Sequence, residues 1–233
     1  MSKIENQSNM DFYDLKFLLS KENLSACVTK DTAYPKFKEI AEILLNKTAI
    51  RKGHKIYHIK DIEFYLYKND HRDIITYPRT CEAGQWFFHS SGIDLSFESN
   101  VTMQPNEYNL FQPILDSSSF FGGILIRQIY PEGTSSESAK KYRLDGPHKV
   151  EWELFDKFDA FNEIKDFPHL VPCENQEREI QSSVRQNLLT SNKTPAQKVK
   201  ELLNYNYYVC EVQESELVDS FLQYKNAEYR FTV

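Results

Sequence analysis

The chain of 233 residues is 40% hydrophobic, 27% charged and 14% aromatic, and its formal net charge is −6. This composition is that of an ordinary globular protein and excludes a disordered, collagenous or coiled-coil chain. The negative net charge argues against a protein that binds nucleic acid over its entire surface. Residues 151–166 and 211–219 each contribute −4, however, which leaves +2 for the rest of the chain and allows a local basic face.

Several kinds of site lack their usual signature. The seven glycines form neither a GxGxxG nor a P-loop pattern. The wide spacing of the cysteines predicts free thiols in a reducing compartment; they are Cys27, Cys81, Cys173 and Cys210. No apolar run approaches the roughly 18 residues of a membrane span, and no apolar leader is evident. We therefore expect a monomeric, cytoplasmic protein without a membrane partner and without a metal or organic cofactor.

The N-terminal part predicts an arm followed by a helix. Residues 1–33 are mostly polar, with FYDLKFLL as a candidate short helix, and we expect them to lie outside the main domain of residues 34–233. A helix is predicted from Pro35, which suits a first helical turn, to Asn46. Its buried face is defined by apolar residues at helical spacing: Phe37, Ile40, Ala41, Leu44 and Leu45.

The next segment predicts a β-hairpin with its turn at residues 52–54, because Gly53 separates two β-prone runs. The second run alternates in character, as a half-buried strand does. One of its faces holds the carboxylate of Glu63 together with Tyr57, Ile59, Asp61 and Tyr65.

The remaining sequence predicts further strands and two helices. Residues 68–83 and 100–119 are expected to be connections, and residues 84–99 one or two strands bent at Ser90–Gly92. GGILIRQIYP predicts a buried strand, which contains Arg127. A helix is expected at about residues 147–163, and Thr194 caps another that has Pro195 at its first position. With strand-like YYVCEV and EYRFTV near the C-terminus, the pattern predicts one α+β domain.

Glu63 and Arg127 are charged residues within strands that are otherwise largely apolar. A buried charge without a partner is costly, so we expect the two to pair. The pair is either a structural ion pair or a catalytic one, in which the carboxylate activates water and the guanidinium orients it. His71 and Tyr65 lie nearby in the sequence and suit a flat heterocycle, although a lone loop histidine is more often a surface residue. The histidines do not have the spacing of a metal site.

Short motifs, in order along the chain, give it a resemblance to the alkyladenine (3-methylpurine) DNA glycosylase family from about residue 34 to the C-terminus. IAEILLNKTAIRKG is similar to the family's A-x-x-LLG-x-x-L-V-R, and HIKDIEFYL to its I-V-E-T-E-A-Y strand. NDHRD, TYPRT and GQWFFH are similar to D-x-x-x-H, T-x-R-N and G-x-L-Y-V-Y. GGILIRQIYP, LDGPHKV and EYRFTV are similar to V-L-L-R-A-L-E-P, G-P-G-K-L and P-W-R-F-Y-V.

The resemblance implies a monofunctional DNA glycosylase of base excision repair, which hydrolyses the N-glycosidic bond of a damaged or modified base after flipping it out. We expect a curved, mainly antiparallel sheet or partial barrel with flanking helices. The catalytic pair would be Glu63, as the base that activates water, and Arg127. The flipped base would be held by Tyr65, His71 and His89. DNA would be bound by Arg79, Gly146 and Lys149.

Some residues depart from the family's pattern. The segment Ser90–Gly92 stands where the family has an intercalating aromatic residue, His89 stands where it has a tyrosine, and the chain is acidic where family members are usually basic. No residue is an evident acid for the leaving base, although Asp73 and Asp94 are candidates.

These departures leave two alternatives open. One is a catalytically diverged module that binds a nucleobase or a nucleic acid, single strands included. The other is a protein-interaction module on the same scaffold, which would use one of the acidic segments 151–166 and 211–219. The second alternative predicts a closed Glu63–Arg127 ion pair with no pocket beside it.

Overall fold

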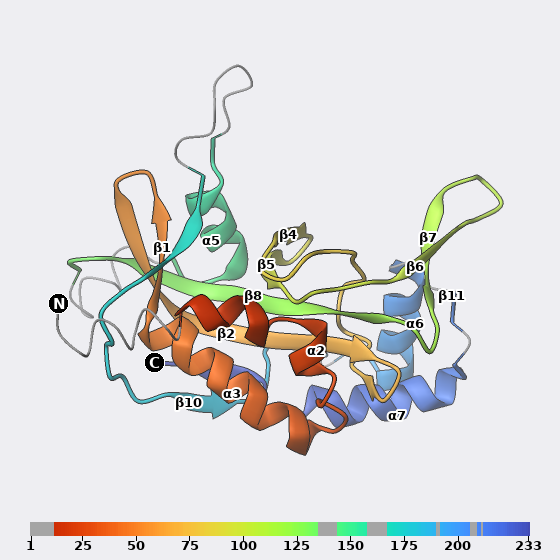
Figure 1. Cartoon of the computed structure of the whole chain (residues 1–233). Coiled ribbons are helices and arrows are strands. Elements are labelled where there is room, and N and C mark those ends of the chain that lie inside the picture. Colours follow the sequence, from red (N-terminus) through yellow and green to blue (C-terminus); the bar gives the residue numbers. More distant parts are fainter. Residues whose placement is uncertain (1–11, 135–143, 158–166, 190–191, 206–208, 211) are drawn as a thin grey trace.

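The computed structural model describes residues 12–134, 144–157, 167–189, 192–205, 209–210 and 212–233. It confirms a single-domain α+β fold with a large sheet that is not closed into a barrel (Figure 1). The nine strands of this sheet are β1 (Thr48–Lys52), β2 (Lys55–Lys68), β3 (His71–Arg72), β4 (Trp86–His89), β5 (Gly92–Ser96), β8 (Phe120–Pro131), β9 (His169–Pro172), β10 (Gln181–Ser183) and β12 (Arg230–Thr232). They are ordered β10–β12–β2–β8–β5–β4, with β1 and β3 also paired to β2, and β9 to β1.

A smaller sheet and several helices complete the described fold. The smaller sheet has the order β11–β7–β6 and comprises β6 (Thr102–Pro105), β7 (Phe111–Leu115) and β11 (Val209–Cys210). The helices with assigned bounds are α2 (Lys21–Leu24), α3 (Lys30–Asn46), α5 (Pro147–Leu154), α6 (Pro195–Tyr205) and α7 (Glu214–Lys225). Figure 1 shows α3 crossing the front of the sheet, with α6 and α7 at its right-hand end.

The β1–β2 hairpin confirms the predicted turn, since Lys52 pairs with Lys55 around a turn with Gly53 at φ 59°. The alternation predicted along β2 does not persist. The pairing of β2 with β8 shifts by one residue on each side of the pair Asp61↔Gln128, and the two shifts cancel. As a result, Tyr57 and Ile59 lie in the same core as Ile62 and Phe64, and not on the face of Glu63.

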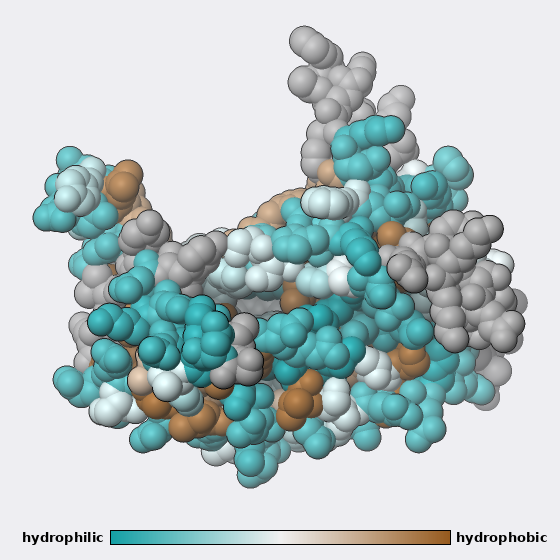
Figure 2. All heavy atoms as spheres, turned by 180° about the vertical axis from the view of Figure 1, so that it is seen from behind, coloured by the Kyte–Doolittle hydropathy of each residue, from teal (hydrophilic) through white to brown (hydrophobic). Residues whose placement is uncertain are grey.

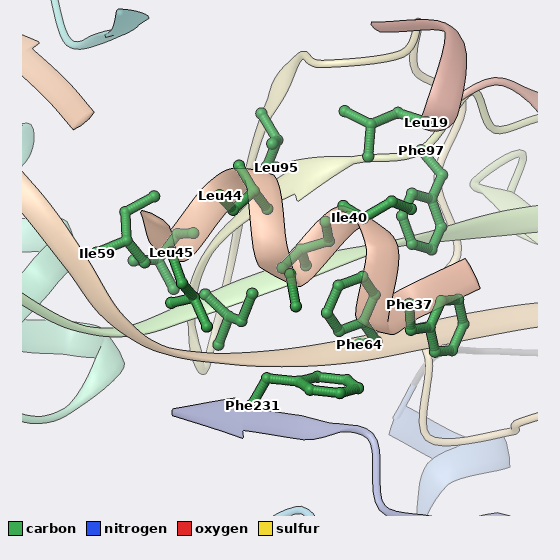
Figure 3. Close-up of a cluster of buried hydrophobic side chains, with 14 of the residues drawn as sticks. Leu19, Phe37, Ile40, Leu44, Leu45, Ile59, Phe64, Leu95, Phe97 and Phe231 are labelled. Carbon is green, nitrogen blue, oxygen red and sulfur yellow. The ribbon is translucent and has the colours of Figure 1, made fainter. Parts of the chain in front are cut away.

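The main core lies between α3 and the sheet. Figure 3 shows Phe37 and Ile40 of α3 near Phe64 on β2 and Phe231 on β12. The rings of Phe37 and Phe64 stack with centroids 4.6 Å apart. Burial of such side chains is worth roughly 1.5–3 kcal/mol each, so this layer fixes the orientation of β2 and thereby of the residues on its other face.

The helix α3 begins earlier than predicted. Its N-cap is Thr29, whose side chain accepts from the Thr32 amide while the Thr32 side chain accepts from the Thr29 amide. This reciprocal capping places Pro35 inside the helix and not in its first turn, whereas the end at Asn46 is as predicted. The expected boundary between residues 33 and 34 therefore falls within α3. Residues 12–33 contribute to the main core through Leu15, Leu18, Leu19, Leu24, Cys27 and Ala33.

Two of the elements that were not predicted are a hairpin and a helix. Residues 102–115, expected to be a connection, form the β6–β7 hairpin, which projects at the upper left in Figure 2. Its exposed residues include Tyr108, Leu110 and Phe111. The other element is α7, which packs on α6 through a second core that includes Val199, Leu217 and Phe221. Hydrophilic residues cover most of the face seen in Figure 2.

Candidate active site

Glu63 lies on the face of β2 that points away from α3, and it is fully buried. Three donors surround the carboxylate. The Tyr65 hydroxyl and the Arg127 Nη1 donate to Oε2 at 2.7 and 3.1 Å, and the backbone N–H of Gln186 donates to Oε1 at 2.8 Å. Burial, followed by the negative charge of Glu63, raises the pKa of Tyr65 well above its ordinary value. Tyr65 therefore keeps its proton and acts as a donor to Glu63.

Arg127 owes its position to the irregularity in the pairing of β2 with β8. It falls between the paired residues Ile126 and Gln128, at the site where one strand carries an extra residue. Such irregularities redirect side chains, and they are common near active sites. The Arg127 side chain is 13% exposed, and its Nη2 also donates to the Gln186 side-chain oxygen at 3.2 Å. The predicted Glu63–Arg127 pair is thus present, with Gln186 bridging its two members.

A cavity of about 360 Å³ adjoins the pair. Its aromatic walls are formed by Tyr65, Tyr77 and His89. Its other lining residues are Ile75, Arg79, Ser91, Asp94, Leu125, Arg127, Pro147, His148, Gln186, Asn187, Leu188, Lys198 and Leu202. Glu63 is not among them, because it lies behind Tyr65, Arg127 and Gln186. The interaction-module hypothesis predicted a closed ion pair with no pocket beside it. The ion pair is closed, but the prediction that no pocket lies beside it is wrong.

Asp94 organises one wall of the cavity. Its Oδ2 accepts from Arg79 Nη2 at 2.7 Å, and its Oδ1 lies 2.9 Å from His89 Nε2. Burial alone would raise the pKa of Asp94, but the charge of Arg79 and the hydrogen bonds from Arg79 and His89 outweigh it and lower the pKa. The Ser91 backbone N–H donates to His89 Nδ1 at 3.2 Å, so Nε2 carries the proton that His89 donates to Asp94. The His89 ring stacks on that of Tyr77 at 4.4 Å. His89 thus forms a fixed aromatic surface at the cavity.

Arg79 does not have the role expected of it. Its guanidinium is buried, ion-paired with Asp94, bonded to the Tyr77 carbonyl at 3.1 Å and placed over the Phe87 ring at 3.9 Å. These contacts neutralise the Arg79 guanidinium inside the protein, so Arg79 is not available to bind a DNA phosphate. As Asp94 is the partner of this arginine, it is also unsuited to protonate a leaving base.

His71 does not line the cavity. It is fully buried, with Nδ1 2.9 Å from the Leu66 carbonyl and Nε2 3.0 Å from the Tyr229 hydroxyl. Its ring centroid lies 4.1 Å from that of Tyr224. Both nitrogens are used and the ring is packed among tyrosines, so the structure corrects the expectation that His71 contacts a flipped base.

Gly146 and Lys149 lie at the start of α5. Gly146 is the N-cap, with φ 119°, and the residues that follow it, Pro147 and His148, line the cavity. Lys149 is half-exposed and forms an ion pair with Asp145 at 3.0 Å, outside the cavity. The structure therefore brings together Glu63, Arg127, Tyr65 and His89, with Gly146 at the edge of the site.

Several cavity residues were missed by sequence reasoning. Gln186, Asn187 and Leu188 line one side of the cavity, yet the sequence around them has no periodicity that would have indicated this. The Arg185 guanidinium is fully buried, paired with Asp73 and placed 4.5 Å from the Tyr65 ring. Asp73 is thereby also unsuited to act as an acid. Lys198 and Leu202 could have been found, since they are four residues apart on α6, whose Thr194 capping box is as predicted.

The described residues contain no cluster of three or more histidines, cysteines, aspartates or glutamates that could hold a metal ion. No helix in the same part of the chain is long and apolar enough to cross a membrane. No protein-family model matches this sequence, and no curated protein or solved structure shows significant similarity to it. The resemblance to alkyladenine DNA glycosylases stays a prediction that depends on the short motifs quoted above.

Proposed function

We propose that the protein hydrolyses the N-glycosidic bond of a damaged or modified base in DNA. The observation that carries this proposal is the Glu63–Arg127 pair directly behind the wall of an aromatic-lined cavity. Pockets of some hundreds of Å³ with apolar walls and few polar groups suit small planar ligands. The rings of Tyr65, Tyr77 and His89 offer surfaces for a flat base, and Gln186 and Asn187 offer amides for its edge.

The carboxylate retains the capacity to bind a water molecule. Each carboxylate oxygen accepts up to two hydrogen bonds. Glu63 Oε2 accepts two, from Tyr65 and Arg127, whereas Oε1 accepts one from the described residues, that of Gln186. A water entering beside Gln186 would donate to the remaining position on Oε1. Arg127 and Tyr65 hold the other oxygen and so fix the orientation of the carboxylate.

In the proposed reaction, Glu63 accepts a proton from this water while the water oxygen bonds to the anomeric carbon of the sugar. The carbon–nitrogen bond breaks, and its electron pair leaves with the base. The proton on Glu63 then returns through solvent to the departed base, which balances the hydrolysis. The transition state resembles an oxocarbenium ion, so the negative carboxylate also stabilises the positive charge that develops on the sugar.

A second candidate is a module that binds a nucleobase without hydrolysing its bond. It is favoured by the complete burial of Glu63 and by the three donors around it, which together resemble a structural ion pair. Both candidates use the same cavity. They differ in whether Glu63 exchanges a proton with water.

A strand-cleavage assay distinguishes the candidates. Labelled single- and double-stranded oligonucleotides with alkylated, deaminated or hypermodified bases are incubated with the protein and treated with alkali. Hydrolysis predicts cleavage by the wild type and a loss of about 100-fold or more in Glu63→Gln, since a general base contributes roughly 10²–10⁴-fold. The matched control is Glu39→Gln, an exposed position on α3. Glu39→Gln should cleave like the wild type.

Two results would contradict hydrolysis by Glu63. One is undiminished cleavage by Glu63→Gln. The other is a lack of cleavage on every oligonucleotide by a wild-type protein whose thermal unfolding shows that it is folded. The second result, combined with binding of the same oligonucleotides, would support the binding module.

A further inference from the structure

A second hollow lies next to the active-site cavity. This hollow has a volume of about 460 Å³ and is lined by Tyr77, Ser90, Lys198, Glu201, Leu202 and Asn204. Tyr77, Lys198 and Leu202 line the active-site cavity as well. The two spaces therefore border the same side chains of α6 and the same tyrosine, and a ligand larger than one base could contact both of them across this border.

Lys198 lies at this junction and brings a positive charge to it. The two guanidinium groups that line the cavity are neutralised, that of Arg79 by Asp94 and that of Arg127 by Glu63. The acid in the second hollow, Glu201, is paired with Lys193 at 2.8 Å. Within the described ranges, Lys198 has no carboxylate partner. A lysine in this situation favours an anionic group bound between the two hollows, such as the phosphodiester that joins two neighbouring nucleotides.

The described turn at the rim of the cavity has no side chain suited to opening a duplex. The turn between β4 and β5 presents Ser90 and Ser91, whose hydroxyls lie 2.9 and 3.1 Å from the Tyr77 hydroxyl. No large side chain of this turn can fill the space that a flipped base leaves in a double helix, and flipping then carries its full unstacking cost of a few kcal/mol. Proteins that hold duplex DNA neutralise several phosphates, roughly 6–10 in strong cases, whereas Lys149 near this rim is already paired with Asp145.

On the basis of the proposed function, we propose that the substrate is single-stranded DNA that occupies both hollows. The target base lies in the active-site cavity, the adjoining phosphate contacts Lys198, and the neighbouring base lies in the second hollow against Tyr77. Aromatic side chains combined with a cation along the backbone are the usual means of holding single strands, and stacking does not require a particular sequence. One lysine suffices here because bases, not phosphates, supply most of the contact.

The test is equilibrium binding measured by fluorescence anisotropy. The probes are a short fluorescein-labelled DNA single strand containing all four bases and the same strand annealed to its complement. The single strand should bind at least about tenfold more tightly than the duplex. Lys198→Gln should weaken single-strand binding about tenfold, and should reduce the slope of log K against log salt by about 0.7, the contribution of one phosphate.

The matched control is Lys200→Gln, an exposed lysine on the same helix that lines neither hollow. It changes the net charge equally and should leave both the affinity and the salt slope unchanged. The proposal is overturned by any of three results: a duplex that binds as tightly as the single strand, equal losses in Lys198→Gln and Lys200→Gln, or no binding of the single strand.

Measuring binding with the Glu63→Gln protein keeps the two proposals apart. If the strand binds as expected but the wild type cleaves no oligonucleotide, the single-strand site is supported and hydrolysis is refuted. If cleavage occurs on duplexes alone, hydrolysis is supported and the single-strand site is refuted.

Discussion

Acidification should destabilise the protein through His71. The ring is fully buried; its Nδ1 donates to the Leu66 carbonyl, and its Nε2 accepts from the Tyr229 hydroxyl. A second proton would have to bind at Nε2, where it would break the bond from Tyr229 and place a charge in the interior. Burial is accordingly the main reason that the pKa of His71 is lowered from 6.5 to about 4.

The direction and size of the effect follow from this difference in pKa. As the pH falls, the unfolded chain takes up the proton before the folded one, so the stability contributed by neutral His71 is complete above pH 6.5 and is lost between pH 6.5 and about pH 4. At 1.36 kcal/mol per unit, the loss between pH 7 and pH 5 is about 2 kcal/mol in the free energy of unfolding.

Urea denaturation at several pH values, followed by tryptophan fluorescence, measures this loss. His71→Gln should be less stable than the wild type at pH 7 because it loses the packing of the imidazole ring. Its free energy of unfolding should not show the further decrease of about 2 kcal/mol between pH 7 and pH 5. The control His54→Gln alters an exposed histidine in the β1–β2 turn and should retain the wild-type pH dependence. Parallel declines in the wild type and His71→Gln would refute the assignment to His71.

Two further predictions concern the support of the site. Asp73→Ala leaves the fully buried Arg185 without its partner and should lower the free energy of unfolding by about 3–5 kcal/mol, measured by urea titration. The double variant Asp73→Leu with Arg185→Met should recover most of this stability. An Asp73→Ala variant as stable as the wild type would contradict a buried ion pair. Gly122→Ala would place a Cβ 2.3 Å from the Tyr65 backbone oxygen and should cost about 3 kcal/mol, visible as a lower melting temperature. An unchanged melting temperature would show that β2 and β8 are less closely packed there.

The sequence predicted the elements whose signals are local. The β1–β2 turn follows from Gly53, and the Glu63–Arg127 pair could be expected because each residue is a charge within an apolar strand. The start of α6 follows from Thr194 and Pro195. In each case a few neighbouring residues determine the structure, so no knowledge of the rest of the chain is needed.

The remainder depends on contacts between distant segments. Arg185 and Asp73 are 112 residues apart, and Gln186 reaches Glu63 across 123 residues. Nothing near either residue in the sequence indicates these contacts. The sequence does not predict the β6–β7 hairpin, because the residues of the hairpin are largely polar and include prolines. The predicted start of α3 is too late because Pro35 suits a first helical turn, whereas the helix is already capped at Thr29.

The paired irregularity in β2 and β8 has a consequence for insertions and deletions in this chain. Pairing is in register from Ile59↔Ile129 to Ile62↔Ile126 because each strand carries one additional residue, and the two compensate. Deleting Lys60 alone would remove the extra residue of β2 and leave that of β8, so the irregularity would become a bulge on one strand, which bends that strand and increases its local twist. Deleting one residue from β8 at the same time would make the pairing regular but remove the position that directs Arg127 at Glu63. A change in the length of one strand alone would therefore alter the bend of the sheet beside Glu63, and a matched change in both would remove the irregularity.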